Sequence, residues 1–170
     1  KIVLKWCSIF FNHVLTVNTK LENWSKEHLN LRSVSYLSNF AMLSDSIAVT
    51  KLAGIKGKRI VCLANLRPQK DHLNLLKAFR IVFNEFPDWT LHLVGGYVED
   101  EYYKTIKSFI QENKLENHVF IYGCCTDVHH IFSQSTIGVL SSKSEGLPLS
   151  LLEYGLAKLP VVVTNVGDCN

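Results

Sequence analysis

Short apolar runs alternate with amphipathic stretches along the last two thirds of the chain. The runs contain four to six residues and read "RIVCLA" (59–64), "TLHLV" (90–94), "VFIY" (119–122), "IGVL" (137–140) and "VVVT" (161–164). Runs without polar alternation are typical of strands that are buried on both faces of a parallel sheet. Helical periodicity between them predicts helices over 72–85, 101–113, 127–134 and 149–157. The pattern therefore predicts an α/β fold with a Rossmann-like, doubly wound parallel sheet.

A shorter pattern of the same kind comes first. Helical spacing over 2–11 is followed by a strand-like run at 13–17, a helix at about 21–28 and a strand at 34–37. Residues 39–58 show no sustained period and carry turn residues, which predicts a linker. We expect part of one domain at 1–38, a linker at 39–58 and a second domain at 59–170. Because the chain starts with Lys1 and ends directly after its last strand, we expect a piece of a longer protein that is truncated at both ends.

Composition limits the choice of partners and cofactors. The 170 residues are 47% hydrophobic, and the 18 basic residues are scattered among 15 acidic ones, so nothing indicates a nucleic-acid partner. The five cysteines lack both CxxC and any zinc-ligand spacing, which predicts reduced thiols and no metal site. No apolar run approaches the roughly 20 residues of a membrane-spanning helix, which leaves only contact with a membrane surface open.

Two other motifs argue against further kinds of site. The segment "GGYVED" after the second long run lacks the G-x-G-x-x-G spacing of a dinucleotide fingerprint, which argues against a nicotinamide enzyme. His129 and His130 are adjacent, so on a helix their side chains would point about 100° apart and would not share one metal ion.

The fold itself predicts where a ligand binds. In an open parallel sheet, ligands bind outside the carboxyl ends of the strands, where the strand order reverses. With the usual order 3-2-1-4-5, the loops after the first and fourth strands face each other there. These loops are "NLRPQKD" and "SSKSEGLP", the most polar in the domain. We expect them to form one crevice.

The first loop carries two cations just before a predicted helix. Arg67 and Lys70 stand three residues apart, and we expect Asp71 to cap the helix that follows. The free N–H groups of a helix N-terminus favour an anion, so this loop could bind two phosphate groups. A solvated loop is the alternative, and spacing alone leaves both open.

The second loop carries two carboxylates around a turn. Gly146 allows close approach of backbone to a ligand, and Pro148 suits the first turn of a helix. Glu145 and Glu153, on either side of this turn, could accept hydrogen bonds from two polyol parts of one ligand. An exposed helix start would place glutamates in the same way, so the residues alone do not decide between these interpretations.

Several segments together resemble a known family. In this order and at these separations, "ANLRPQKDHLNLLKAF", "LHLVGG", "VFIYG" and "SSKSEGLPLSLLEYGLAKLPVVVTNVG" resemble the nucleotide-binding half of retaining family 4 glycosyltransferases with the GT-B fold. The likeness runs from about Gly57 to the end of the chain. Residues 1–38 are similar to the end of the N-terminal, acceptor-binding domain, most of which is missing.

The resemblance implies a role for each candidate residue. Arg67, Lys70 and Glu145 would be catalytic: the two cations would neutralise the donor diphosphate in place of a metal ion, and the carboxylate would face the donor sugar. The other implied residues would bind the donor: Glu153 the ribose, the backbone of Gly146, Leu147 and Pro148 the sugar and phosphate, and the loop from Gly123 to Thr126 the base.

The implied reaction moves a sugar from a UDP- or GDP-sugar to a glycan or lipid-linked acceptor, with retention, in cell-surface polysaccharide synthesis. We expect no cofactor besides this donor, a cytoplasmic location that includes the cytoplasmic face of the membrane, a peripheral membrane contact through the missing domain, and no activity of the fragment alone. A non-catalytic nucleotide-sugar-binding module and a GT-B-fold sugar-nucleotide epimerase are the alternatives. Hydrolysis is disfavoured because both carboxylates would have to flank one bond.

Overall fold

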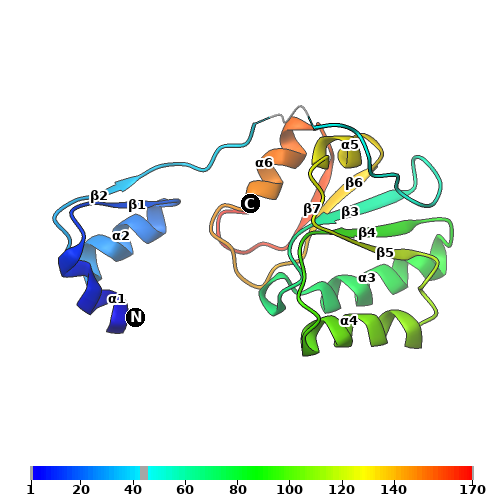
Figure 1. The fold of residues 1–170 in the computed structure, drawn as a ribbon, viewed down its shortest axis with the longest axis horizontal. Helices are drawn as coiled ribbons and strands as arrows, with labels where there is room; N and C mark the ends of the chain where they lie inside the picture. Colours follow the sequence, from blue (N-terminus) through cyan, green and yellow to red (C-terminus); the bar gives the residue numbers. More distant parts are fainter. Residues whose placement is uncertain (1, 43–45, 170) are drawn as a thin grey trace.

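The computed structural model describes residues 2–42 and 46–169, which form a small N-terminal unit and a larger α/β unit joined by an extended segment (Figure 1). The predicted linker at 39–58 includes residues 43–45, which lie outside the described residues.

The larger unit is built on one parallel sheet of five strands in the order β5-β4-β3-β6-β7. Counted within this unit, that order is 3-2-1-4-5, so the predicted doubly wound topology is confirmed. The strands are β3 (Arg59–Leu63), β4 (Thr90–Val94), β5 (Val119–Gly123), β6 (Ile137–Leu140) and β7 (Val161–Val163).

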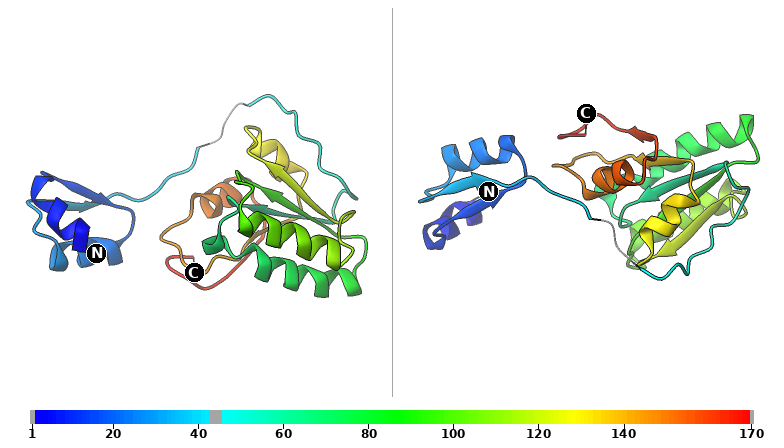
Figure 2. Two further views of the ribbon diagram at one scale, coloured as in Figure 1. Left: turned by 60° about the horizontal axis from the view of Figure 1, so that its bottom comes forward. Right: turned by 90° about the horizontal axis from the view of Figure 1, so that it is seen from above.

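Helices cover both faces of this sheet. Right-handed connections place two helices on each face, with α3 and α4 on one side and α5 and α6 on the other (Figures 1 and 2). Their bounds are α3 (His72–Glu85), α4 (Glu101–Glu112), α5 (Val128–Ser133) and α6 (Leu149–Leu156), and a short 3-10 turn, η2 (Pro68–Lys70), precedes α3.

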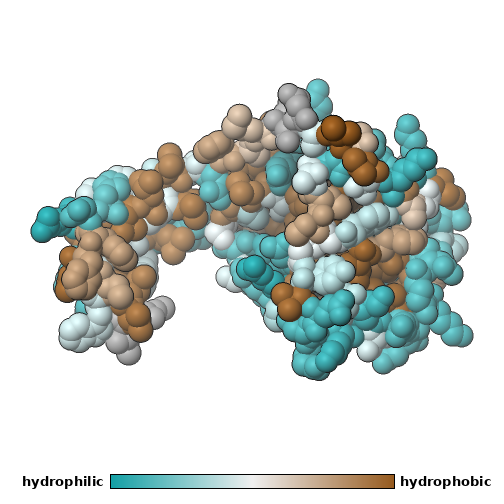
Figure 3. All heavy atoms as spheres, in the orientation of Figure 1, coloured by the Kyte–Doolittle hydropathy of each residue, from teal (hydrophilic) through white to brown (hydrophobic). Residues whose placement is uncertain are grey.

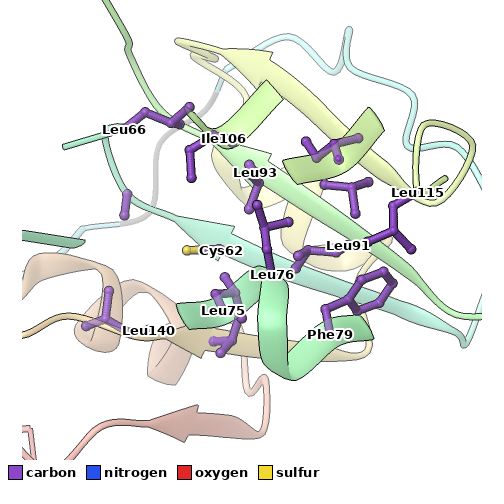
Figure 4. Packing of buried hydrophobic residues seen from close by; sticks show 14 of the residues in the cluster. Cys62, Leu66, Leu75, Leu76, Phe79, Leu91, Leu93, Ile106, Leu115 and Leu140 are labelled. Atoms are coloured by element: carbon purple, nitrogen blue, oxygen red, sulfur yellow. The ribbon is translucent and has the colours of Figure 1, made fainter. Parts of the chain in front are cut away.

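The main core lies between the sheet and the α3–α4 layer (Figure 4). The apolar face of α3 packs on the inner residues of β3 and β4, and every residue of β4 is buried. Burial also raises the pKa of the Cys62 thiol to about 12, so this thiol stays protonated and acts as a small apolar side chain. The residues involved are Cys62, Leu75, Leu76, Phe79, Leu91 and Leu93.

The sheet opens between β3 and β6. These strands pair only as far as Val61 and Gly138, and beyond that point the hydroxyl of Tyr154 on α6 accepts the hydrogen bond of the Leu63 N–H at 2.7 Å. A Cβ on Gly138 would lie 3.0 Å from the Tyr154 ring, so glycine makes room for this side chain. The tyrosine therefore satisfies a backbone group that would lose its partner where the strands diverge.

The small unit leaves much of its apolar surface exposed. Trp6 is 74% and Phe10 is 80% exposed, and Figure 3 shows apolar side chains over this unit and the segment that leaves it. Two strands and three short helices are too few to bury an apolar face. The elements are α1 (Ile2–Cys7), η1 (Ser8–Phe10), β1 (Val14–Thr16), α2 (Thr19–His28) and β2 (Val34–Tyr36), with β1 and β2 parallel. Within residues 2–42 and 46–169, no helix is both long and apolar enough to cross a membrane.

The second half of the predicted linker is attached to the larger unit. The Asp127 carboxylate accepts hydrogen bonds from the N–H groups of Val49 (2.8 Å) and Thr50 (2.6 Å) and from the Thr50 hydroxyl (2.7 Å). Gln134 continues the attachment by accepting from the Leu52 N–H at 3.1 Å. The bonds from Thr50 and Val49 lower the pKa of Asp127 to about 2, because they stabilise the charged form.

We expect Asp127→Asn to lower stability at neutral pH and to lose this effect in acid. The folded pKa of about 2 lies below the ordinary value of 3.8, so the carboxylate contributes stability above about pH 4 and loses it as the pH falls toward 2. Urea unfolding from pH 7 to pH 3 measures the free energy of unfolding of the wild type and of Asp127→Asn. The difference between these two free energies should become smaller below pH 4. A difference that stays constant with pH would contradict this prediction. Asp88→Asn, at an exposed ion pair, serves as the control.

Candidate functional site

A crevice of about 530 Å³ lies at the carboxyl ends of β3 and β4, beside the start of α6. This is the place that the topology predicts, and we call it the switch-point crevice. Its lining residues are Asn39, Leu63, Ala64, Asn65, Lys70, Val94, Gly95, Leu147, Pro148, Leu149, Ser150 and Glu153.

Two of the predicted residues meet at this crevice. The Lys70 ammonium lies 2.5 Å from the Glu145 carboxylate, so the loops after β3 and β6 are joined by an ion pair. The side chain of Glu145 is only 8% exposed and that of Lys70 is 21% exposed. A carboxylate this deeply buried needs a charged partner, and Lys70 provides it. Because an ammonium has three donors, Lys70 can hold Glu145 and still bind a second oxygen.

Further hydrogen bonds connect the same two loops. The Ser141 hydroxyl donates to the Lys70 carbonyl at 2.9 Å, and the Gln69 side-chain amide donates to the Ser144 carbonyl at 2.6 Å. In the opposite direction, the Lys143 N–H donates to the Gln69 carbonyl at 2.9 Å. These bonds fix Lys70 and its partner in position before any ligand binds.

The start of α3 differs from the sequence-based prediction in two ways. Asp71 was expected to cap this helix, but its backbone is left-handed (φ 51°) and its side chain makes no capping bond. An N-cap side chain reaches the first turn from extended backbone, whereas here the Asp71 carboxylate lies 3.4 Å from the Lys143 ammonium. The free N–H groups expected at this helix end are also not all free, because the His72 N–H donates to the Tyr102 hydroxyl at 2.8 Å.

Arg67 is not brought into the crevice by this structure. It precedes η2 with extended backbone, is exposed, and does not belong to the lining of the switch-point crevice. Among the described residues its side chain has no ion-pair partner. Its role in binding a diphosphate stays a prediction.

The start of α6 faces the crevice with its backbone. No side chain caps this helix, and Pro148, its first flanking residue, lines the crevice together with Leu149 and Ser150. The N–H groups of an uncapped helix end attract an anion. Glu153 lines the same crevice from one turn further along α6, whereas Glu145 does not belong to the lining and reaches it only through its ion pair with Lys70. The roles of the two carboxylates stay predictions.

The C-terminal segment packs against the turn before α6. Gly167 has a left-handed backbone (φ 62°), and a Cβ at this position would lie 2.0 Å from the Glu145 carbonyl oxygen. Next to it, the Asp168 N–H donates to the Gly146 carbonyl at 3.0 Å. Only glycine allows this close approach, which places the backbone of Glu145.

The loop predicted to lie beside a nucleotide base adjoins the crevice without lining it. The Gly123 carbonyl accepts from the N–H of Gly95, a lining residue, at 2.8 Å. Thr126 is exposed and lies outside the lining. The role of the segment from Gly123 to Thr126 stays a prediction.

Sequence reasoning missed two polar residues of the site. Asn65 lines the crevice and accepts from the Gly96 N–H at 2.8 Å. Its place directly after a buried strand was a usable signal. Asn39 lines the crevice from the predicted linker, 108 residues before the residue it contacts, so no local pattern could indicate it.

Buried groups near the site add little charge to it. Burial lowers the pKa of His72 to about 4, so this ring is neutral at pH 7 and does not add to the positive charge of Lys70. Burial and, next, the Glu145 carboxylate raise the pKa of the Cys169 thiol, which therefore stays protonated. The described part of the chain contains no group of three or more His, Cys, Asp or Glu side chains placed to hold a metal ion.

Comparisons with known proteins identify the family of this chain. The sequence profile of the family described as Glycosyl transferases group 1 matches residues 50–169. An uncharacterized glycosyltransferase of Haemophilus influenzae is 32% identical over 115 residues, which cover 68% of this chain and 32% of that protein. A UDP-Gal:alpha-D-GlcNAc-diphosphoundecaprenol alpha-1,3-galactosyltransferase of Escherichia coli is 27% identical over 188 residues, which cover 100% of this chain and 48% of that protein.

A solved structure shows the same fold. The Anabaena protein HepE in complex with UDP and glucose has a TM-score of 0.79 at 18% identity, over 98% of this chain and 48% of that one. The chain thus spans about half, or less, of the length of these relatives. Because the family profile covers most of the chain, the protein belongs to the group 1 glycosyltransferases and carries the C-terminal, Rossmann-like half of their GT-B fold.

Proposed function

We propose that this chain binds a nucleotide diphosphate sugar, UDP- or GDP-linked, and supplies the donor half of a glycosyltransferase. The whole reaction would transfer the sugar to a glycan or lipid-linked acceptor with retention, in cell-surface polysaccharide synthesis. The observation that carries the proposal is the Lys70–Glu145 pair at the switch-point crevice, beside the uncapped start of α6. The Escherichia coli and Anabaena relatives support it, since their names specify UDP-Gal and UDP with glucose.

Lys70 and the start of α6 are suited to the negative charge of the donor diphosphate. In the transfer step the bond between the anomeric carbon and the terminal phosphate oxygen breaks, and its electron pair leaves with the nucleoside diphosphate. The acceptor hydroxyl oxygen would form the new bond to carbon, and its proton would pass to the phosphate oxygen that has taken the electron pair. Lys70 and the N–H groups at the start of α6 would stabilise the negative charge on the leaving diphosphate, and such electrostatic stabilisation is commonly the largest catalytic contribution.

We expect Glu153→Gln to weaken UDP binding by roughly 10-fold, because a neutral amide replaces charge-assisted hydrogen bonds to the ribose hydroxyls. A comparison with 2′-deoxy-UDP tests whether the lost hydrogen bonds go to the ribose. The wild-type chain should prefer UDP to 2′-deoxy-UDP, and Glu153→Gln should lose most of this preference. Calorimetry measures all four affinities, and Glu112→Gln, on the exposed surface of α4, is the matched control.

The outcomes distinguish the alternatives. If the wild-type chain binds neither UDP nor GDP at millimolar concentration, the proposed function is wrong. Binding without sugar transfer to a panel of acceptors would favour a non-catalytic binding module, whereas an isomerised donor without acceptor would indicate an epimerase. An unchanged preference for UDP over its deoxy analogue in Glu153→Gln would remove this residue from the ribose site.

A further inference from the structure

A residue of the connecting segment reaches the turn between the two glutamates. The side-chain amide of Asn39 donates to the Leu147 carbonyl at 2.6 Å, across 108 residues of sequence. Asn39 is half-buried and lines the switch-point crevice together with Lys70 and Glu153. The segment that leaves β2 is therefore bonded to the backbone that precedes α6 (Figure 1).

The small unit approaches the same turn at a second point. A Cβ on Gly146 would lie 3.3 Å from the Asn18 side-chain nitrogen and 3.6 Å from a Val17 methyl group. The Asn18 side chain is held in place because its oxygen caps α2, accepting from the Leu21 N–H at 2.7 Å. The corner between β1 and α2 thus covers the glycine of the turn.

Together these contacts fix two successive peptide planes. The Gly146 carbonyl accepts from the Asp168 N–H, and the Leu147 carbonyl accepts from Asn39. In a planar trans peptide the N–H points opposite to the carbonyl, so the first bond directs the Leu147 N–H away from Asp168. Pro148 has no N–H and a fixed φ (−72°), so the second bond sets the plane from which α6 begins.

We propose that Asn39 is a positioning residue that couples the small unit to the donor-binding turn. A donor that binds against the turn would favour the arrangement in which the Asn39 bond forms, and the bond would in turn favour the donor, because coupling between two sites is reciprocal. This inference rests on the proposed function, since it needs a donor in the switch-point crevice.

The test measures affinities for UDP and UMP, or for GDP and GMP if the wild-type chain prefers guanine. We expect Asn39→Ala to weaken diphosphate binding roughly five- to tenfold, the size of one hydrogen bond, and monophosphate binding less than twofold. Asn39→Gln keeps the N–H donor and should recover part of the loss, whereas Asn39→Asp should not. Asn30→Ala, at an exposed asparagine of the small unit, is the control.

Hydrogen exchange supplies a readout that a purely structural role would leave unchanged. In the wild-type chain UDP should slow exchange at residues 34–42 as well as in α6. In Asn39→Ala the protection at 34–42 should disappear while that in α6 remains. Equal diphosphate affinity and equal protection in Asn39→Ala would overturn the inference and leave the proposed function standing. A wild-type chain that binds no nucleotide would instead remove the proposed function, and the inference with it.

Discussion

Lys70→Ala should weaken UDP binding by roughly 10- to 100-fold, because it removes the charge-assisted contact that we propose Lys70 makes with the diphosphate. The same change should lower the free energy of unfolding by about 1–3 kcal/mol, since it leaves the buried Glu145 carboxylate without its partner. Calorimetry with UDP and urea unfolding measure the two effects separately.

A second substitution separates binding from stability. In Lys70→Ala combined with Glu145→Gln the unpaired charge is gone, so stability should recover while UDP affinity stays low. Lys143→Ala, in the facing loop and with a side chain that is 64% exposed, should change both quantities little. Wild-type UDP affinity in the double variant would show that Lys70 does not bind the diphosphate.

Gly167→Ala should both destabilise the protein and reduce donor affinity. The new Cβ would meet the Glu145 carbonyl oxygen at 2.0 Å, and the backbone is left-handed there. Left-handed strain and overpacking together predict a loss of about 2–4 kcal/mol in the free energy of unfolding. Because the Glu145 backbone must move to relieve the contact, affinity for UDP-sugars should fall as well.

Gly155→Ala is the matched control for this prediction. Gly155 lies in α6, and a Cβ there would meet no atom within 4 Å. Alanine in a helix is better by about 0.5–1 kcal/mol than glycine, so this variant should be as stable as the wild type or slightly more stable. Equal unfolding midpoints for the two variants would mean that the segment at Gly167 does not support the crevice.

The local pattern of the chain was sufficient to predict most of the larger unit. The runs at 90–94 and 137–140 coincide with β4 and β6, because short, largely apolar runs bounded by turn residues are typical of buried parallel strands. The strand order was predicted as the usual one for a doubly wound sheet rather than derived from any residue. It brought Lys70 and Glu145 to one crevice although 75 residues separate them.

The pattern of hydrophobic and polar residues could not predict interactions between distant segments. At the start of α3 the His72 N–H is bonded to the hydroxyl of Tyr102, which lies in the next helix, 30 residues away. No spacing rule marks a tyrosine as a capping residue. Asp71 has a left-handed backbone and its carboxylate pairs with Lys143 of the facing loop, whereas its sequence position alone favoured an ordinary cap. Asn39 reaches its partner only after both units have folded.

The place of Tyr154 bears on how the site could be changed without loss of the fold. Its hydroxyl bonds α6 to β3 where the sheet opens, one residue beyond Glu153, so this side of the crevice is tied to the sheet. Asn39 lines the crevice from the segment that connects the two units, and it contacts the turn before α6 only through its side-chain amide. Redesign of donor preference would therefore start at Asn39 and at the loop residues, and would keep the Tyr154 anchor unchanged.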